Sequence, residues 1–344
     1  ERNWWKSVFR TGEIVNANIQ ASGGSEKFQY MVGAGYYNEK GIMINSAYSR
    51  ANLRSNLSAQ LTEKLRMDTR IYLSYVDRTM NRGHNSNYTG IDAAPEKQPT
   101  YMGGSKELED EFLLRIREQR DRTDDYRAMA SIFMEYELLE GLSFSATGSV
   151  DYSQGNLNQF VPSFFDEKNH RNVSTGAMNR AIAISTEELL HYSKSFKEAH
   201  NFDLLLGVTA NKEQNFRMGG SGMGGPSDHV YYYDNKKNPS IVNLGKGDYP
   251  NWVSNTTYYS DFTEKVLVSY FGRLGYNYKQ RYLFEFTFRR DGSSTFGEGN
   301  RWANFPSVAL GWAFSDEPFI KRFTEGWLNW GKIRASYGTS GQTF

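Results

Sequence analysis

The sequence contains no cysteine, which excludes disulfide bonds, thiolate metal sites and a cysteine nucleophile. It has no excess of charge of one sign either, since 40 Lys and Arg residues against 39 Asp and Glu residues give a net charge of +1. A nucleic-acid-binding protein would show a clustered basic excess, so we expect no nucleic-acid partner. No segment approaches the ~18 consecutive apolar residues of a transmembrane helix. The mean hydropathy of −0.67 agrees with that absence.

Aromatic side chains are abundant instead. The 7 Trp, 23 Tyr and 22 Phe residues make up 15% of the 344 residues, although hydrophobic residues in total reach only 38%. Tyr276, Tyr278 and Tyr282 flank a Lys-Gln-Arg turn, as the aromatic girdle of a membrane protein would. A cluster of core aromatics in a soluble sheet is the alternative interpretation.

Hydrophobic and polar residues alternate with a period of two along at least six segments, which is typical of β-strands with one apolar face. In one segment Phe284, Phe286 and Phe288 alternate with Glu285 and Thr287. The segments are about 9–13 residues long, the length that a tilted strand needs to cross a bilayer, against ~5–6 in ordinary sheets. With 14–22 as the first strand and 332–337 as the last, the pattern predicts about twelve strands.

The connections between these strands alternate between short and long. The short ones are 23–26, 62–64, 139–141, 193–199 and 279–281, and the long ones are about 38–47, 77–125, 153–179, 210–263 and 290–301. Outer-membrane barrels have this order, with short periplasmic turns and long extracellular loops. We therefore predict an all-β fold, a transmembrane antiparallel β-barrel. A soluble or surface-attached all-β carbohydrate-binding or hydrolytic protein is the alternative, since a sandwich also alternates.

No combination of residues predicts catalysis or metal binding. Glu187, Glu188 and His191 would suit a metal only on a helix, and on a strand positions 187 and 191 lie ~13 Å apart. The segment 219–225 contains a formal G-x-G-x-x-G pattern, but a proline follows it, so a flexible loop is expected rather than a dinucleotide site. Within the loop 77–125, residues 105–122 predict a helix that packs there or docks a partner. We expect no enzyme, no cofactor and no metal.

The loop 210–263 carries the best candidates for ligand binding. Exposed aromatic planes suit sugar rings, whose CH faces pack on the π-surface while their hydroxyls reach polar groups. The alternative is that these aromatics hold the loop against itself or a partner. The candidate residues are Tyr231, Tyr232, Tyr233, Trp252, Tyr258 and Tyr259.

Arginine residues recur on the polar side of the alternating pattern and are predicted to line the lumen of the barrel. They are Arg50, Arg54, Arg66, Arg70, Arg273 and Arg289. Selectivity for anions is the weaker interpretation, because Asp68, Glu135 and Glu285 share the same side. Nearby, Asp291-Gly292-Ser293-Ser294 predicts a tight turn in which Gly292 has a positive φ. A cation site is the less favoured alternative.

Several sequence blocks have a familiar order and spacing. They are Trp5–Gly12, Ser22–Lys27, Gly35–Ile42, Arg50–Arg54, Phe288–Gly297, Asn300–Trp302, Phe305–Ser307, Gly311–Trp312, Glu317–Phe319 and Arg334–Gly338. Together they resemble the SusC/RagA-type TonB-dependent transporters of Bacteroidota outer membranes. The resemblance covers nearly the whole chain, although 78–264 matches only in its strands.

The resemblance implies a 22-stranded barrel, of which about twelve strands are present here. That family also has a signal peptide and an N-terminal plug domain, and neither is found in this sequence, so we expect residues 1–344 to be part of a barrel domain. It implies that the lumen arginines hold the plug and that Arg290, Asp291, Gly292, Ser293 and Ser294 form the family's motif turn.

The resemblance further implies an outer-membrane importer of oligosaccharides or peptides in a Gram-negative bacterium. Its partners would be a SusD-like surface lipoprotein, the TonB complex acting through the plug, the glycan or peptide ligand and the lipid bilayer. A siderophore or vitamin receptor of another TonB-dependent family is a second alternative.

Overall fold

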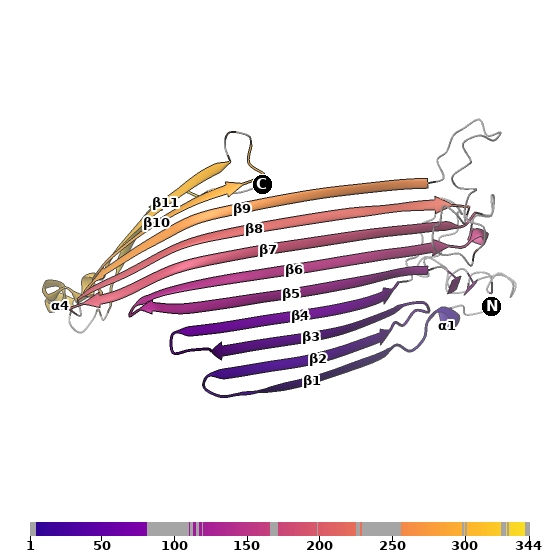
Figure 1. Ribbon diagram of the computed structural model, residues 1–344, viewed down its shortest axis with the longest axis horizontal. Helices are drawn as coiled ribbons and strands as arrows, with labels where there is room; N and C mark the ends of the chain where they lie inside the picture. The colour runs from indigo at the N-terminus through magenta and orange to yellow at the C-terminus, as the bar shows by residue number, and fades with distance from the viewer. Residues whose placement is uncertain are drawn as a thin grey trace.

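The computed structural model describes residues 5–80, 110, 113–114, 117–118, 120–165, 171–197, 199–224, 228, 256–297, 299, 301–324, 328 and 330–340. Its strands form one antiparallel sheet of twelve strands that lie side by side in chain order, as a single curved layer (Figure 1). The strands are β1 (Glu13–Gly24), β2 (Phe28–Lys40), β3 (Ala47–Gln60), β4 (Leu65–Thr79), β5 (Arg120–Leu139), β6 (Leu142–Val161), β7 (Val173–Phe196), β8 (His200–Met223), β9 (Thr256–Tyr278), β10 (Tyr282–Ser293), β11 (Trp302–Trp312) and β12 (Ile333–Gly338). The helical elements are α1 (Trp5–Val8), η2 (Ser163–Phe165), η3 (Phe314–Asp316) and α4 (Pro318–Thr324).

The predicted alternation becomes two chemically different faces of this sheet. Because the side-chain period of a strand is two, residues paired across neighbouring strands lie on the same face. Leu274 pairs with Phe286, which pairs with Val308, so these three belong to one side, the apolar face. Arg273 pairs with Thr287, and both belong to the other side, the polar face.

The apolar face is exposed in the described structure. Large side chains on it that remain about 40% exposed are Leu53, Leu73, Ile132, Phe144, Leu206, Leu274 and Phe286. The buried hydrophobic residues among the described ones are only Val8, Ala59, Phe160 and Ala313. A sheet with so small a core needs an apolar medium on this face, and a bilayer supplies one. The alternative of a soluble sandwich is therefore wrong for the described strands, which form one layer.

The alternation of short and long connections is confirmed. Turns of two to four residues join β1 to β2, β3 to β4, β5 to β6, β7 to β8 and β9 to β10. Longer segments join the other ends of the strands. The first and last strands lie where the pattern predicted them, at Glu13–Gly24 and Ile333–Gly338. No helix in the described ranges is long and apolar enough to cross a bilayer.

The predicted bounds of the long loops were too wide. Pairing between β8 and β9 continues to Gly222 and Thr256, deep inside the range 210–263. Likewise β5 begins at Arg120 and β7 at Val173, inside the ranges 77–125 and 153–179. Beyond the bilayer neither face of a strand has to be apolar, so alternation stops while the backbone ladder continues. Hydrophobic periodicity therefore gives no signal for these strand ends.

Residues at the loop end of the sheet form the small cluster around Val8. Phe9, Ile44 and Leu113 pack against this fully buried side chain. Leu113 lies in the predicted helix 105–122, whose described residues 110, 113, 114, 117 and 118 are helical. The helix ends earlier than predicted, because β5 already begins at Arg120.

Candidate functional site

Polar residues mark the level at which β8 and β9 leave the bilayer. On the apolar face Lys212 Nζ lies 3.0 Å from Glu264 Oε2, and Gln214 donates to the same oxygen at 2.6 Å. Nearer the turns this face carries Val208 and Ala210 on β8 and Val268 on β9 instead. We call the strand ends beyond this level, residues 212–223 and 256–264, the extended wall.

Tyr259 lies on the polar face of the extended wall, with the hydroxyl end of its ring close to Gly219. It pairs with Gly219, and a Cβ atom added to Gly219 would lie 2.7 Å from the Tyr259 hydroxyl oxygen and 2.8 Å from the ring carbons Cε1 and Cζ. The ring therefore covers the glycine backbone, an arrangement known as aromatic rescue of a strand glycine. Tyr259 is nevertheless 54% exposed, so part of its aromatic surface is accessible to a ligand.

The segment predicted as a flexible glycine-rich loop is thus strand up to Met223. The signal that sequence reasoning missed was the pairing of small residues with large ones, glycines at 219 and 220 opposite Tyr259 and Tyr258. Tyr258 lies on the apolar-face side of the wall and is 69% exposed. The other predicted ligand residues, Tyr231, Tyr232, Tyr233 and Trp252, lie outside the described residues.

The six predicted lumen arginines all lie on the polar face. Three of them have carboxylate partners: Arg66 pairs with Asp68 at 2.8 Å, Arg273 with Asp203 at 2.8 Å and Arg289 with Asp291 at 2.7 Å. Among the described residues, the other three, at positions 50, 54 and 70, have no carboxylate within ion-pair distance. No close ion pair within the described sheet therefore occupies these three guanidinium groups.

One of these arginines borders a hollow in the polar face. The hollow has a volume of about 530 Å³, and Arg50, Tyr72, Arg127, Asn179 and Arg217 line it from β3, β4, β5, β7 and β8. Arg127 donates to Asp151 at 2.7 Å, which fixes one side of the hollow. The lining offers hydrogen-bond donors, aromatic surface and the carboxylate of Asp125.

His191 belongs to a polar network that the sequence did not predict. Its Nε2 lies 2.7 Å from Asp203 Oδ2, and Arg273 donates to the other oxygen of Asp203 at 2.8 Å. Glu187 shares the polar face with His191, whereas Glu188 lies on the apolar face. The three residues therefore do not share one face, and the described residues contain no group of three metal-binding side chains.

The motif turn at 290–294 was predicted incorrectly. Arg290, Asp291, Gly292 and Ser293 are strand residues of β10, and only Ser294 lies in the turn that follows. Gly292 has no positive φ; it is needed because a Cβ atom there would lie 2.8 Å from three atoms of the Trp302 ring. The Arg290 guanidinium lies 5.0 Å from the centre of the same ring.

A buried carboxylate holds the opposite, turn end of the same hairpin. Glu317 accepts hydrogen bonds from the Tyr282 hydroxyl, from Trp312 Nε1 at 3.1 Å and from Arg281 Nη1 at 2.9 Å. The hydrogen bond from Tyr282 is the main cause that lowers the pKa of the Glu317 carboxyl below its usual value. Tyr282 and Trp312 are register partners on the apolar face, so Glu317 lies over that face.

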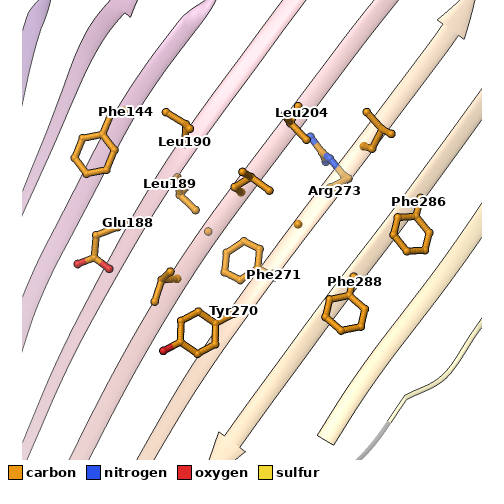
Figure 2. Close-up of a pocket in the computed structure, with 15 residues that line it drawn as sticks. Phe144, Glu188, Leu189, Leu190, Leu204, Tyr270, Phe271, Arg273, Phe286 and Phe288 are labelled. Atoms are coloured by element: carbon orange, nitrogen blue, oxygen red, sulfur yellow. The ribbon is translucent and has the colours of Figure 1, made fainter.

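The apolar face also has a hollow, shown in Figure 2, that Phe144, Leu204, Leu206, Phe286 and Phe288 line together with Gly272. Gly272 adds no side chain to this hollow, and a Cβ atom there would lie 3.1 Å from Leu206 Cδ2. Glu188 lies at the edge of the hollow as a carboxylate among apolar residues. A charge in that position is costly in lipid, whereas the sequence pattern had suggested only a role as a metal ligand for Glu188.

A single-layer sheet with one apolar and one polar face, short turns and extended strand ends belongs to an outer-membrane β-barrel. No family model matches the chain. TonB-dependent receptor P3 of Formosa agariphila is 28% identical, in an alignment that covers 98% of this chain and 34% of that receptor. TonB-dependent receptor SusC of Bacteroides thetaiotaomicron is 26% identical, in an alignment that covers 99% of this chain and 35% of SusC.

Solved structures agree on the fold. The RagAB peptide transporter matches with a TM-score of 0.70 and 21% identity, over 98% of this chain and 38% of that one. The ferric citrate transporter FecA matches with a TM-score of 0.50 and 10% identity, over 90% of this chain and 41% of the FecA chain. The chain thus corresponds to the barrel region of a SusC/RagA-type TonB-dependent receptor, in the outer membrane of a Gram-negative bacterium. It spans about a third of the length of these curated relatives.

Proposed function

We propose that the receptor containing this chain imports oligosaccharides through its barrel and that Tyr259 is part of the ligand-binding surface. The observation that carries the proposal is the half-exposed Tyr259 ring, which lies against Gly219 on the polar face of the extended wall. A flat, half-exposed ring beside Asp261 and Arg217, which pair with each other in register, combines an apolar plane with polar groups. Sugar rings need both.

Peptides are the second candidate ligand. A RagAB structure that shares this fold is described as a peptide transporter. The polar-face hollow around Arg50 and Tyr72 supports the same idea, because the N–H groups that line it could donate hydrogen bonds to the backbone carbonyl oxygens of a peptide.

The arginines of the polar face that have no close carboxylate partner are candidates for contacts with a plug domain. We infer that Arg50, Arg54 and Arg70 contact carboxylates or carbonyls of a plug domain inside the barrel, since none of the three has a carboxylate of the described sheet within ion-pair distance. The TonB complex would act through that plug, and a SusD-like lipoprotein would cover the extended wall. These partners agree with the family and complete an importer that carries out no covalent chemistry.

The test compares Tyr259→Ala with Tyr258→Ala in the whole receptor. The two tyrosines are neighbours on β9, but they lie on opposite faces of the wall. Removing an aromatic stacking partner costs about 0.5–1.5 kcal/mol, so Tyr259→Ala should weaken oligosaccharide binding about 2–10-fold. Tyr258→Ala should leave it unchanged. Equal effects of the two substitutions in a titration with purified receptor would contradict the proposal, and a response to peptides alone would favour the second ligand.

A further inference from the structure

The connection between β11 and β12 differs from every other described connection at the turn end. The others are two to four residues long, whereas this one covers residues 313–332 and contains η3 and α4. Antiparallel neighbours can be joined by two residues, so the additional helix is not needed to continue the sheet. Figure 1 shows α4 at the turn end, where the strands of the sheet converge.

Glu317 determines on which side of the sheet this connection lies. Its carboxylate is bound by Tyr282 and Trp312, two side chains of the apolar face. Phe314 packs edge-on against the same Trp312 ring at 6.0 Å between ring centres. Glu317 is only 5% exposed and immediately precedes α4, so it ties the start of the helix to the apolar face rather than to the lumen.

The helix presents large apolar side chains to its surroundings. Phe319 and Phe323 are four residues apart and therefore lie on the same side of α4. They are 59% and 83% exposed, and Trp330, later in the connection, is 63% exposed. Lys321 and Arg322 lie between the two phenylalanines and are also exposed. Exposed aromatics combined with basic residues are the composition of helices that lie in a membrane interface.

We propose that α4 is an interfacial anchor that binds phospholipids of the periplasmic leaflet, with Phe319 and Phe323 among the acyl chains and Lys321 and Arg322 at the phosphates. Two observations favour lipid as the occupant. The helix begins on the apolar face, next to Tyr282 and continuous with the surface that the bilayer covers. Its two adjacent basic residues complement anionic headgroups. A plug domain would lie on the opposite, polar face.

Site-specific fluorescence on the whole receptor tests this proposal. The chain has no cysteine, so Phe323→Cys introduces a single labelling site within it once any cysteine elsewhere in the receptor has been replaced. Ser336→Cys on β12 is the control, because its partner Ala309 places it on the polar face. Both variants would carry an environment-sensitive dye in vesicles of phosphatidylethanolamine and phosphatidylglycerol.

The expected result is that spin-labelled acyl chains quench the dye at position 323 but not at 336, whereas aqueous iodide quenches only position 336. Quenching of position 323 by iodide alone would overturn the proposal, because α4 would then face water or protein. If Phe323→Cys does not insert, Phe319→Cys gives the same readout.

Charge reversal tests the headgroup contacts separately. Lys321→Glu combined with Arg322→Glu should reduce the folding equilibrium constant about fivefold per charge in vesicles with phosphatidylglycerol, and much less in pure phosphatidylcholine. An equal loss in both lipids would exclude the proposed phosphate contacts. Neither measurement depends on the transported ligand, so their failure would leave the proposed import function untouched.

Discussion

Placing an arginine on the apolar face of β10 is the sharpest test of the two-faced sheet. Phe286 lies four residues from Tyr282, the aromatic residue at the turn end. Four residues at ~3.4 Å each, tilted by ~40°, place it about 10 Å inside a band about 25 Å thick, near the midplane. An arginine at the midplane costs about 2–4 kcal/mol, so Phe286→Arg should reduce the folding equilibrium constant roughly 30- to 800-fold.

Thr287→Arg is the matched control, one residue further along the same strand. Its side chain lies on the polar face, where its hydroxyl is 2.5 Å from the Ser307 hydroxyl. Losing that hydrogen bond costs about 1 kcal/mol, while the new charge faces a polar lumen. Urea unfolding of the whole receptor in lipid vesicles measures both variants. Equal losses, or a larger loss for Thr287→Arg, would refute the assignment of the two faces.

Three further substitutions test individual features, each by unfolding of the whole receptor in vesicles. Glu188→Leu removes a carboxylate from the apolar face and should stabilise the barrel by about 1–2 kcal/mol. Glu187→Leu, on the polar face, should not stabilise it. Stabilisation by both substitutions would contradict the placement of the two side chains on opposite faces. Gly292→Ala should destabilise by about 1–3 kcal/mol because its Cβ would clash with the Trp302 ring, and a similar loss in a Trp302→Ala background would disprove that cause. Because the pKa of Glu317 is lowered in the folded protein, its stabilisation is present above the usual carboxyl value of ~4.3 and is lost as the pH falls below it. The free energy of unfolding of Glu317→Gln should therefore fall less at acid pH than that of the wild type. The same pH dependence in both proteins would argue against a stabilising role of the Glu317 carboxylate.

The sequence predicted the membrane-spanning part of the fold well, because there one physical requirement acts on every second residue. Lipid on one face and water on the other impose a period of two, so the strand at Glu13–Gly24 and the position of Phe286 could be predicted from alternation alone. The strand ends above the bilayer could not be predicted. At Gly219 and Tyr259 the ladder continues, but nothing requires either face to be apolar.

The candidate site was harder to predict for a related reason. Asp291-Gly292 has the composition of a turn, and local propensity favours that interpretation. The structure instead uses Gly292 because Trp302, ten residues later, needs the space above it. His191 and Asp203 likewise meet only across the turn between β7 and β8. Contacts between partners on neighbouring strands depend on register, which composition does not encode.

Register also explains why the hairpin of β10 and β11 carries the most recognisable motifs. Tyr282 pairs with Trp312 at the turn end, and Gly292 pairs with Trp302 at the loop end. The ten residue-to-residue steps from 282 to 292, at ~3.4 Å each and tilted by ~40°, span about 26 Å, close to the ~25 Å apolar band of an outer-membrane barrel. Each end thus places a tryptophan at a boundary of the bilayer, with Arg290 beside Trp302 and Glu317 bound to Trp312. The motif residues at the two ends therefore fix the hairpin at the depth that matches the membrane.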